Sequence, residues 1–97
     1  MPVYLVGNID IHDREGYSKY EVGFMEVFQK FNGKLLAVDE NQKTIEGEWP
    51  ATRTVIMEFP SKDDAMAWYE SDAYQNLKQH RLDASSGDSV LVAGFPS

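Results

Sequence analysis

The chain has 97 residues, of which 42% are hydrophobic and 26% are charged. This length suits a single domain over residues 1–97, and the composition is that of a globular protein rather than a disordered one. Nine basic residues against 16 acidic ones give a net charge of −7, and there are no cysteines. We therefore expect no nucleic-acid partner, and we expect no disulfides, thiolate metal sites or thiol nucleophiles.

The first residues of the chain do not have the pattern of a signal peptide. Residues 1–6 contain no basic residue, and the polar Asn8 and Asp10 follow at once. No apolar run approaches the roughly 20 residues that a membrane-spanning helix needs. We expect a soluble, cytoplasmic protein with no membrane partner.

The first half of the chain predicts a strand, a helix and a second strand. Residues 3–11 alternate and are rich in β-branched and aromatic side chains, which is typical of a strand. Asp13 can cap a helix whose apolar residues recur every three or four positions up to Phe31. Residues 34–38 predict a short strand, and the polar connection over residues 39–51 is long enough for a strand extension or a hairpin.

The second half predicts a strand, a broken helix and a last strand. Residues 52–59 form the clearest strand pattern. Ser61 and Asp64 then resemble a capping box, with Asp in place of the usual Glu or Gln. Ser71-Asp72 interrupts the helical pattern, so we expect two helical segments. Residues 84–88 have turn chemistry, and residues 89–95 predict the fourth strand.

This order of elements predicts the α+β class and the ferredoxin-like split β-α-β arrangement. Two crossovers interleave into a four-stranded antiparallel sheet with the helices on one face. The other face is also apolar, with Tyr4 and Val6 on the first strand and Ile56 on the third. The simplest cover for that face is the same face of a second copy, so we expect a homodimer that pairs through the sheet. The alternative is a monomer with an apolar open face.

Several segments in order resemble the domain-of-unknown-function family 1330. They are Asp13 with Tyr17 and Tyr20, residues 46–50, residues 55–61, and residues 67–74 with Arg81. The resemblance implies a dimeric α+β barrel, in which two ferredoxin-like sheets face each other. It implies little about activity, because the wider superfamily includes cofactor-independent monooxygenases, haem-degrading enzymes, muconolactone isomerases, chlorite dismutases and stress-response proteins.

Three polar residues on strands with apolar neighbours are the first candidates for chemistry. Asn8, Asp10 and Glu58 belong to the face that we interpret as the inner one. Two carboxylates in a partly desolvated cavity would have one raised pKa and could act as a general acid or base. Alternatively, they lie near strand ends in water, or pair with Arg53 or Arg81.

The other candidates also have alternative interpretations. Trp49 could stack on a flat ligand at the mouth of a cavity, or only plug the long connection. Arg81 could anchor a ligand carboxylate, or complement the dipole at the end of its helix. Trp68 has the spacing of a core residue. The set of pocket candidates is Asn8, Asp10, Trp49, Glu58 and Arg81, followed by Tyr20, Arg53, Trp68 and His80.

His80 with Asn8 and Trp68 resembles the Asn, Trp and His set of the haem-degrading proteins. When the segments are aligned, however, the histidine position falls on Lys78. Phosphate-loop, paired-histidine and serine-nucleophile motifs are missing from the sequence. We therefore expect no cofactor and no metal.

The functional prediction is a small dimeric protein of uncharacterised activity that binds a small organic ligand between sheet and helices. The alternatives are a cofactor-independent monooxygenase- or isomerase-like enzyme and a non-catalytic, stress-related dimer. A cleft of several hundred Å³ where Asp10, Glu58 and Arg81 converge would favour a ligand site, and a filled interior would favour the non-catalytic dimer.

Overall fold

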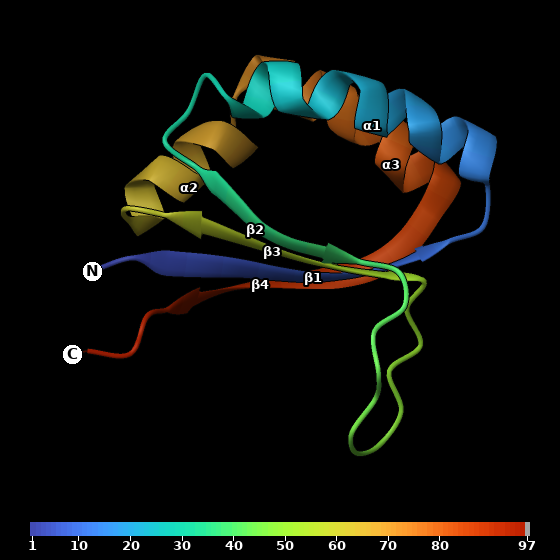
Figure 1. The fold of residues 1–97 in the computed structure, drawn as a ribbon. Coiled ribbons are helices and arrows are strands. Elements are labelled where there is room, and N and C mark those ends of the chain that lie inside the picture. Colours follow the sequence, from blue (N-terminus) through green and yellow to red (C-terminus); the bar gives the residue numbers. More distant parts are fainter. Residues whose placement is uncertain (97) are drawn as a thin grey trace.

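Four strands form one antiparallel sheet in the order β2-β3-β1-β4, and the helices lie together on one side of it (Figure 1). The structure is a computed structural model that describes residues 1–96. Its elements in chain order are β1 (Val3–Ile11), α1 (Arg14–Phe28), β2 (Lys34–Asp39), β3 (Arg53–Phe59), α2 (Lys62–Tyr69), α3 (Asp72–Ala84) and β4 (Ser85–Ala93). The predicted α+β class and split β-α-β topology are confirmed.

Each helix begins at the polar residue that its sequence predicts or allows. The Asp13 carboxylate accepts a hydrogen bond from the Gly16 amide at 3.1 Å and caps α1. The Ser61 hydroxyl accepts from the Asp64 amide at 3.1 Å, and Ser71 caps α3 in the same way. These caps satisfy amides that have no partner inside the helix. The break of the second helical region into α2 and α3 is confirmed.

The predicted turn over residues 84–88 is wrong, because helix α3 leads directly into strand β4. The Ser85 hydroxyl donates to the Arg81 carbonyl at 2.6 Å and so occupies a free acceptor at the end of the helix. Gly87 lies within the strand, where a Cβ would collide with the backbone of Asn8. The lack of a side chain at Gly87 therefore allows β4 to lie close to β1, and it does not form a turn.

The connection over residues 40–52 contains neither a strand nor a helix, so the hairpin considered for it does not form. It projects from the sheet on the side away from the helices, and the C-terminal segment leaves on the same side (Figure 1). The indole nitrogen of Trp49 donates to the Thr54 hydroxyl at 2.8 Å. This bond ties the base of the projecting connection to the sheet.

The two faces of the sheet differ in what covers them. Side chains alternate along a strand, so Leu5, Val55 and Met57 point toward the helices while Tyr4 and Ile56 point away. The core lies between the sheet and the helices, and its largest fully buried side chains are Trp68, Tyr17, Phe28 and Phe59. We call the other side of the sheet the open face. No helix in the described part of the chain is long and apolar enough to cross a membrane.

Candidate functional site

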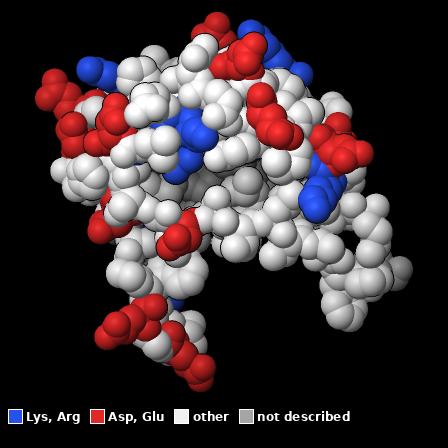
Figure 2. All heavy atoms as spheres, turned by 180° about the vertical axis from the view of Figure 1, so that it is seen from behind, with Lys and Arg blue, Asp and Glu red and all other residues white. Residues whose placement is uncertain are grey.

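A cavity of about 220 Å³ lies between the sheet and the helices α1 and α3. Figure 2 shows a hollow between the helical layer and the sheet, with cationic and acidic side chains at its rim. The floor is formed by helix-facing residues of β1 and β3, and aromatic rings form much of the walls. The apolar and aromatic lining includes Leu5, Ile9, Val55, Met57, Tyr17, Tyr20, Phe24, Trp68, Tyr69 and Tyr74.

No large side chain fills the cavity above the middle of the sheet, because small residues occupy this part of two adjacent strands. Gly7 of β1 pairs with Ser89 of β4, and both line the cavity. A Cβ placed on Gly7 would come no closer than 3.8 Å to another heavy atom, which is an ordinary contact. Close packing therefore does not require a glycine at this helix-facing position, and the missing side chain leaves empty space in the cavity.

One end of the cavity carries hydroxyl groups, and the other end is apolar. Helix α1 presents tyrosines in its first half, at positions 17 and 20, and phenylalanines in its second half, at positions 24 and 28. The hydroxyls of Tyr20 and Tyr74 are 2.9 Å apart and form a buried hydrogen bond. Burial raises the pKa of both Tyr17 and Tyr20, so these phenols stay neutral at physiological pH. The hydroxyl end can therefore donate hydrogen bonds to a ligand.

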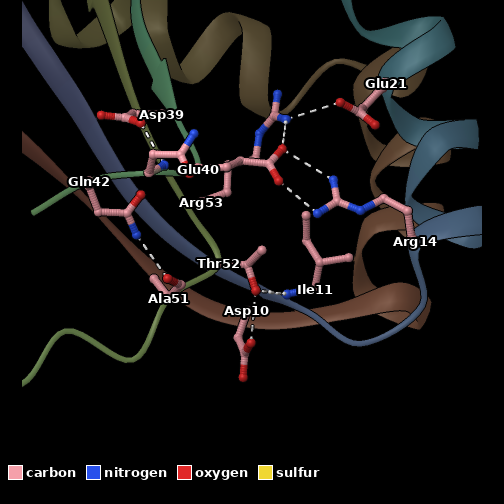
Figure 3. A network of polar contacts seen from close by, with 11 residues as sticks. Asp10, Ile11, Arg14, Glu21, Asp39, Glu40, Gln42, Ala51, Thr52 and Arg53 are labelled. Atoms are coloured by element: carbon pink, nitrogen blue, oxygen red, sulfur yellow. Dashed lines mark hydrogen bonds and ion pairs between the residues drawn. The ribbon is translucent and has the colours of Figure 1, made fainter.

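An ion-pair network stands at the rim of the cavity (Figure 3). Nη1 of Arg53 lies 3.0 Å from carboxylate oxygens of both Glu21 and Glu40, and Arg14 binds Glu40 at 2.7 Å. The hydrogen bond from Arg14 has the largest effect and lowers the pKa of Glu40; burial opposes it, and the hydrogen bond from Arg53 lowers the pKa further. The Arg53 side chain is only 15% exposed and its guanidinium also lies 5.5 Å from the Tyr17 ring centroid. This network ties α1, β3 and the start of the projecting connection together.

Five of the candidate residues line the cavity. Tyr20, Trp68 and Arg81 belong to its walls, and Arg53 belongs to its rim. Asn8 borders the cavity from an even-numbered position of β1, and its side-chain oxygen, which points away from the helices, accepts from the Asp88 amide at 3.0 Å. The structure therefore brings together both arginines, one of the two tryptophans and the hydroxyl of Tyr20.

Three other candidates belong to the open face. Asp10 is exposed and accepts from the Thr52 hydroxyl at 3.1 Å (Figure 3). Glu58 lies opposite Tyr4, and its hydrogen bond raises the pKa of that phenol. Trp49 is 43% exposed in the connection. Asp10, Glu58 and Arg81 do not converge, because even-numbered positions of β1 and β3 point away from the helices.

His80 is exposed in a shallow groove outside the cavity, between α1 and α3. It therefore does not meet Asn8 and Trp68, and the three do not form a haem-like set. Within residues 1–96, no three His, Asp or Glu side chains gather in a way that could hold a metal ion.

Several polar cavity residues, including Glu21, Tyr17 and Tyr74, were not among the sequence candidates. In the sequence, Glu21 has the pattern of an ordinary exposed acid on a helix. Only the fold shows that Arg53 lies beside it. Tyr74 could have been suspected, because a tyrosine at a core position must find a partner for its hydroxyl. The same signal was present in Tyr17 and Tyr20, which stand where the helix could equally have used phenylalanine.

Solved structures share this fold at low sequence identity. A protein of unknown function from Rhodopseudomonas palustris aligns with a TM-score of 0.80 and 16% identity, over 99% of this chain and 84% of that one. SnoaB, a cofactor-independent oxygenase from Streptomyces nogalater, aligns with a TM-score of 0.69 and 11% identity, over 99% and 95% of the two chains. A dimeric ferredoxin-like protein of unknown function from Thermobifida fusca gives 0.68 and 9%, over 96% and 91%. At these identities the likeness shows the fold alone.

The comparison with protein families agrees with the resemblance of the sequence segments. No curated protein matches the chain. The family model described as Domain of unknown function (DUF1330) matches residues 2–95, which is nearly the whole chain. The chain therefore belongs to the DUF1330 family, which is defined by a domain of unknown function.

Proposed function

We propose that this protein is a homodimer that binds one small, mainly apolar organic molecule in the cavity between its sheet and helices. The observation that carries the proposal is the aromatic-walled cavity with a hydroxyl group at one end. Ligand sites are typically apolar clefts with few, well-placed polar groups. The cysteine-free chain suits a reducing compartment such as the cytoplasm.

The volume of the cavity limits the size of the ligand. Drug-sized ligands occupy clefts of about 300–1,000 Å³, and an apolar cavity of about 150 Å³ is enough for benzene. A cavity of about 220 Å³ lies between these values. It suits a molecule of one or two fused rings.

The experiment is a thermal-shift screen with one- and two-ring aromatic compounds, both charged and neutral. A compound that binds only the folded protein raises Tm. In Gly7→Leu, a side chain grows from the floor into the cavity, and its Cβ meets no heavy atom closer than 3.8 Å, so we expect the shift to disappear while the protein still folds. Ala67→Leu adds the same side chain at an exposed position of α2 and should keep the shift. The proposal fails if no compound shifts Tm, or if Gly7→Leu retains the full shift.

The homodimer part of the proposal depends on the open face. The apolar residues of that face include Tyr4, Val6, Ile56, Val90 and Val92, with Val90 56% and Val92 43% exposed. A sheet of this size covers roughly 19 by 25 Å, or about 500 Å², whereas a stable interface takes about 800 Å² from each partner. The projecting connection and the C-terminal segment leave on this same side and can supply the rest (Figure 1).

A second candidate function is catalysis without a cofactor on the bound molecule, as an oxygenase or isomerase. SnoaB, which shares the fold, is described as a cofactor-independent oxygenase. The neutral hydroxyls and Arg81 stand where they could stabilise a negative charge on a reacting oxygen. Incubation of each bound compound in air, followed by mass spectrometry, separates the functions. A gain of oxygen indicates an oxygenase, a rearranged product of equal mass an isomerase, and recovery of the compound a non-catalytic, stress-related dimer or binding protein.

A further inference from the structure

Two arginines line the cavity, and they differ in their partners. Arg53 is neutralised by Glu21 and Glu40, each 3.0 Å from its Nη1. Among residues 1–96, no carboxylate lies within 4.0 Å of the Arg81 guanidinium. Arg81 is therefore the cation of the cavity whose charge is not matched by an acid within residues 1–96.

The surroundings of Arg81 are those of a partly desolvated site. Its side chain is half-buried, and its guanidinium carbon lies 5.9 Å from the centroid of the Tyr20 ring. Tyr20 in turn bonds to Tyr74. A guanidinium always carries its charge and presents donors in a planar fork, which matches a carboxylate. In this apolar setting an anion would interact with it more strongly than in water.

The hydroxyl pair adds a further donor at the same end. One of the two hydroxyls donates to the other, so the second keeps its hydrogen for another acceptor. An oxygen of a ligand that lay against Arg81 could accept it. The two acids that also border the cavity do not take this place, because Glu21 pairs with Arg53 and Asp88 is exposed with no ion pair to Arg81.

The common role of a basic residue in the last turn of a helix is to complement the helix dipole. Arg81 does lie in the last turn of α3. That role is fulfilled equally well by a side chain in water, however, and does not explain why the guanidinium lies against aromatic rings in the cavity wall.

We propose that the ligand carries one oxyanion, a carboxylate or an ionised enol or phenol, which binds Arg81 at the hydroxyl end while its ring system occupies the apolar end. This inference rests on the proposed function and names the chemical class of its ligand. It also gives the ligand an orientation, since the anion lies toward Arg81 and Tyr20 and the rings toward Phe24, one turn further along α1.

The test compares naphthoate with the uncharged naphthamide, which has the same ring system and nearly the same shape. Calorimetric titration of the wild-type dimer should give a dissociation constant about tenfold or more lower for naphthoate, the usual advantage of a charge-assisted hydrogen bond. In Arg81→Met the preference should vanish. Lys78→Met removes the same charge from the same helix, at a residue that bonds to Tyr69 but does not line the cavity, and should keep the preference.

Each result has a definite meaning. Equal binding of the two compounds by the wild type, or a preference that survives Arg81→Met, would overturn the inference and leave the proposed function intact. If neither compound binds, the inference fails, and the thermal-shift screen decides the proposed function separately. If Arg81→Met does not fold, Arg81→Lys keeps the charge but loses the fork, and its preference should be reduced but not lost. At about pH 10 naphthoate and naphthol both carry an oxyanion. The one that the wild type then binds more tightly identifies the kind of oxyanion that the site accommodates, and Arg81→Met should weaken the binding of both.

Discussion

The two faces of the sheet have similar apolar residues but different functions in this account. The helix-facing side has a glycine in the middle of β1, a ring of aromatic side chains, and in Arg81 a cation that has no ion pair within the described residues. The open face has no cover of its own, and its polar residues bond to neighbours on the same surface, as Trp49 does to Thr54. In the function that we propose, the first face holds a small molecule and the second holds another copy of the chain. Hydrophobicity alone does not distinguish these two functions. The features that distinguish them are the cavity above Gly7 and the charge of Arg81, which both belong to the helix-facing side.

The largest effect should come from placing a charge on the open face. Ile56 lies between Val6 and Ala37 in the middle of that face. Ile56→Glu would bury an uncompensated charge in each half of a symmetric interface, at a cost of about 3 kcal/mol or more, so the dissociation constant should rise by about a hundredfold. Sedimentation equilibrium at micromolar concentration should show a dimer for the wild type and a monomer for the variant.

Val22→Glu is the matched control for this experiment. Val22 is 85% exposed on α1, on the helical side of the molecule, and its replacement should leave the dimer intact. A wild-type protein that is a monomer at this concentration would contradict the assignment of the open face. So would an Ile56→Glu variant that remains a dimer.

An intermediate effect is expected from the hydroxyl pair on the covered face. Tyr20→Phe removes one hydroxyl and leaves that of Tyr74 buried without its partner, which should lower the free energy of unfolding by about 1–3 kcal/mol. The double change Tyr20→Phe with Tyr74→Phe removes both groups and should recover much of that loss. Urea unfolding of the single and double variants measures the difference. A double variant that is destabilised by the sum of the single changes would show that the pair is not coupled.

The smallest effect should come from the rim network. The Arg14 hydrogen bond holds the pKa of Glu40 below its ordinary value of 4.5. A depressed carboxyl pKa stabilises the folded state above the ordinary value, and this contribution is lost as the pH falls through the lower, folded-state pKa. Because the pair is largely exposed, we expect less than about 1 kcal/mol. Glu40→Gln should flatten the decline in Tm below about pH 4.5, and an unchanged acid profile would contradict this role.

Much of the fold could be predicted from the sequence, because periodicity and caps are local signals. The strand pattern of residues 3–11, the Asp13 cap and the helix break at Ser71 all appear in the structure. The start of β4 could not be predicted from the sequence, because Gly87 and the serines near it are typical turn residues. Only the structure shows that the backbone of Asn8 lies against Gly87.

The site was harder to predict because it depends on which face the helices cover. Alternation assigns Asp10 and Glu58 to the same side of the sheet as Tyr4 and Val6. Both sides are apolar, however, so the sequence does not show which of them the helices cover. Arg81, Arg53 and Tyr20 were identified as candidates, yet only the tertiary structure shows that Glu21 and Glu40 neutralise one arginine and not the other.

The two tryptophans offer the most direct test, because Trp68 lines the cavity and Trp49 lies on the side of the open face. Their indole N–H signals can be followed separately in the ¹H–¹⁵N spectrum of the unmodified protein, first as naphthoate is added and then as the protein is diluted. We expect the ligand to shift the Trp68 signal and to leave that of Trp49 in place, while dilution toward the monomer shifts Trp49 alone. If naphthoate shifts Trp49 instead, or if dilution moves Trp68 and not Trp49, the assignment of the two faces is contradicted.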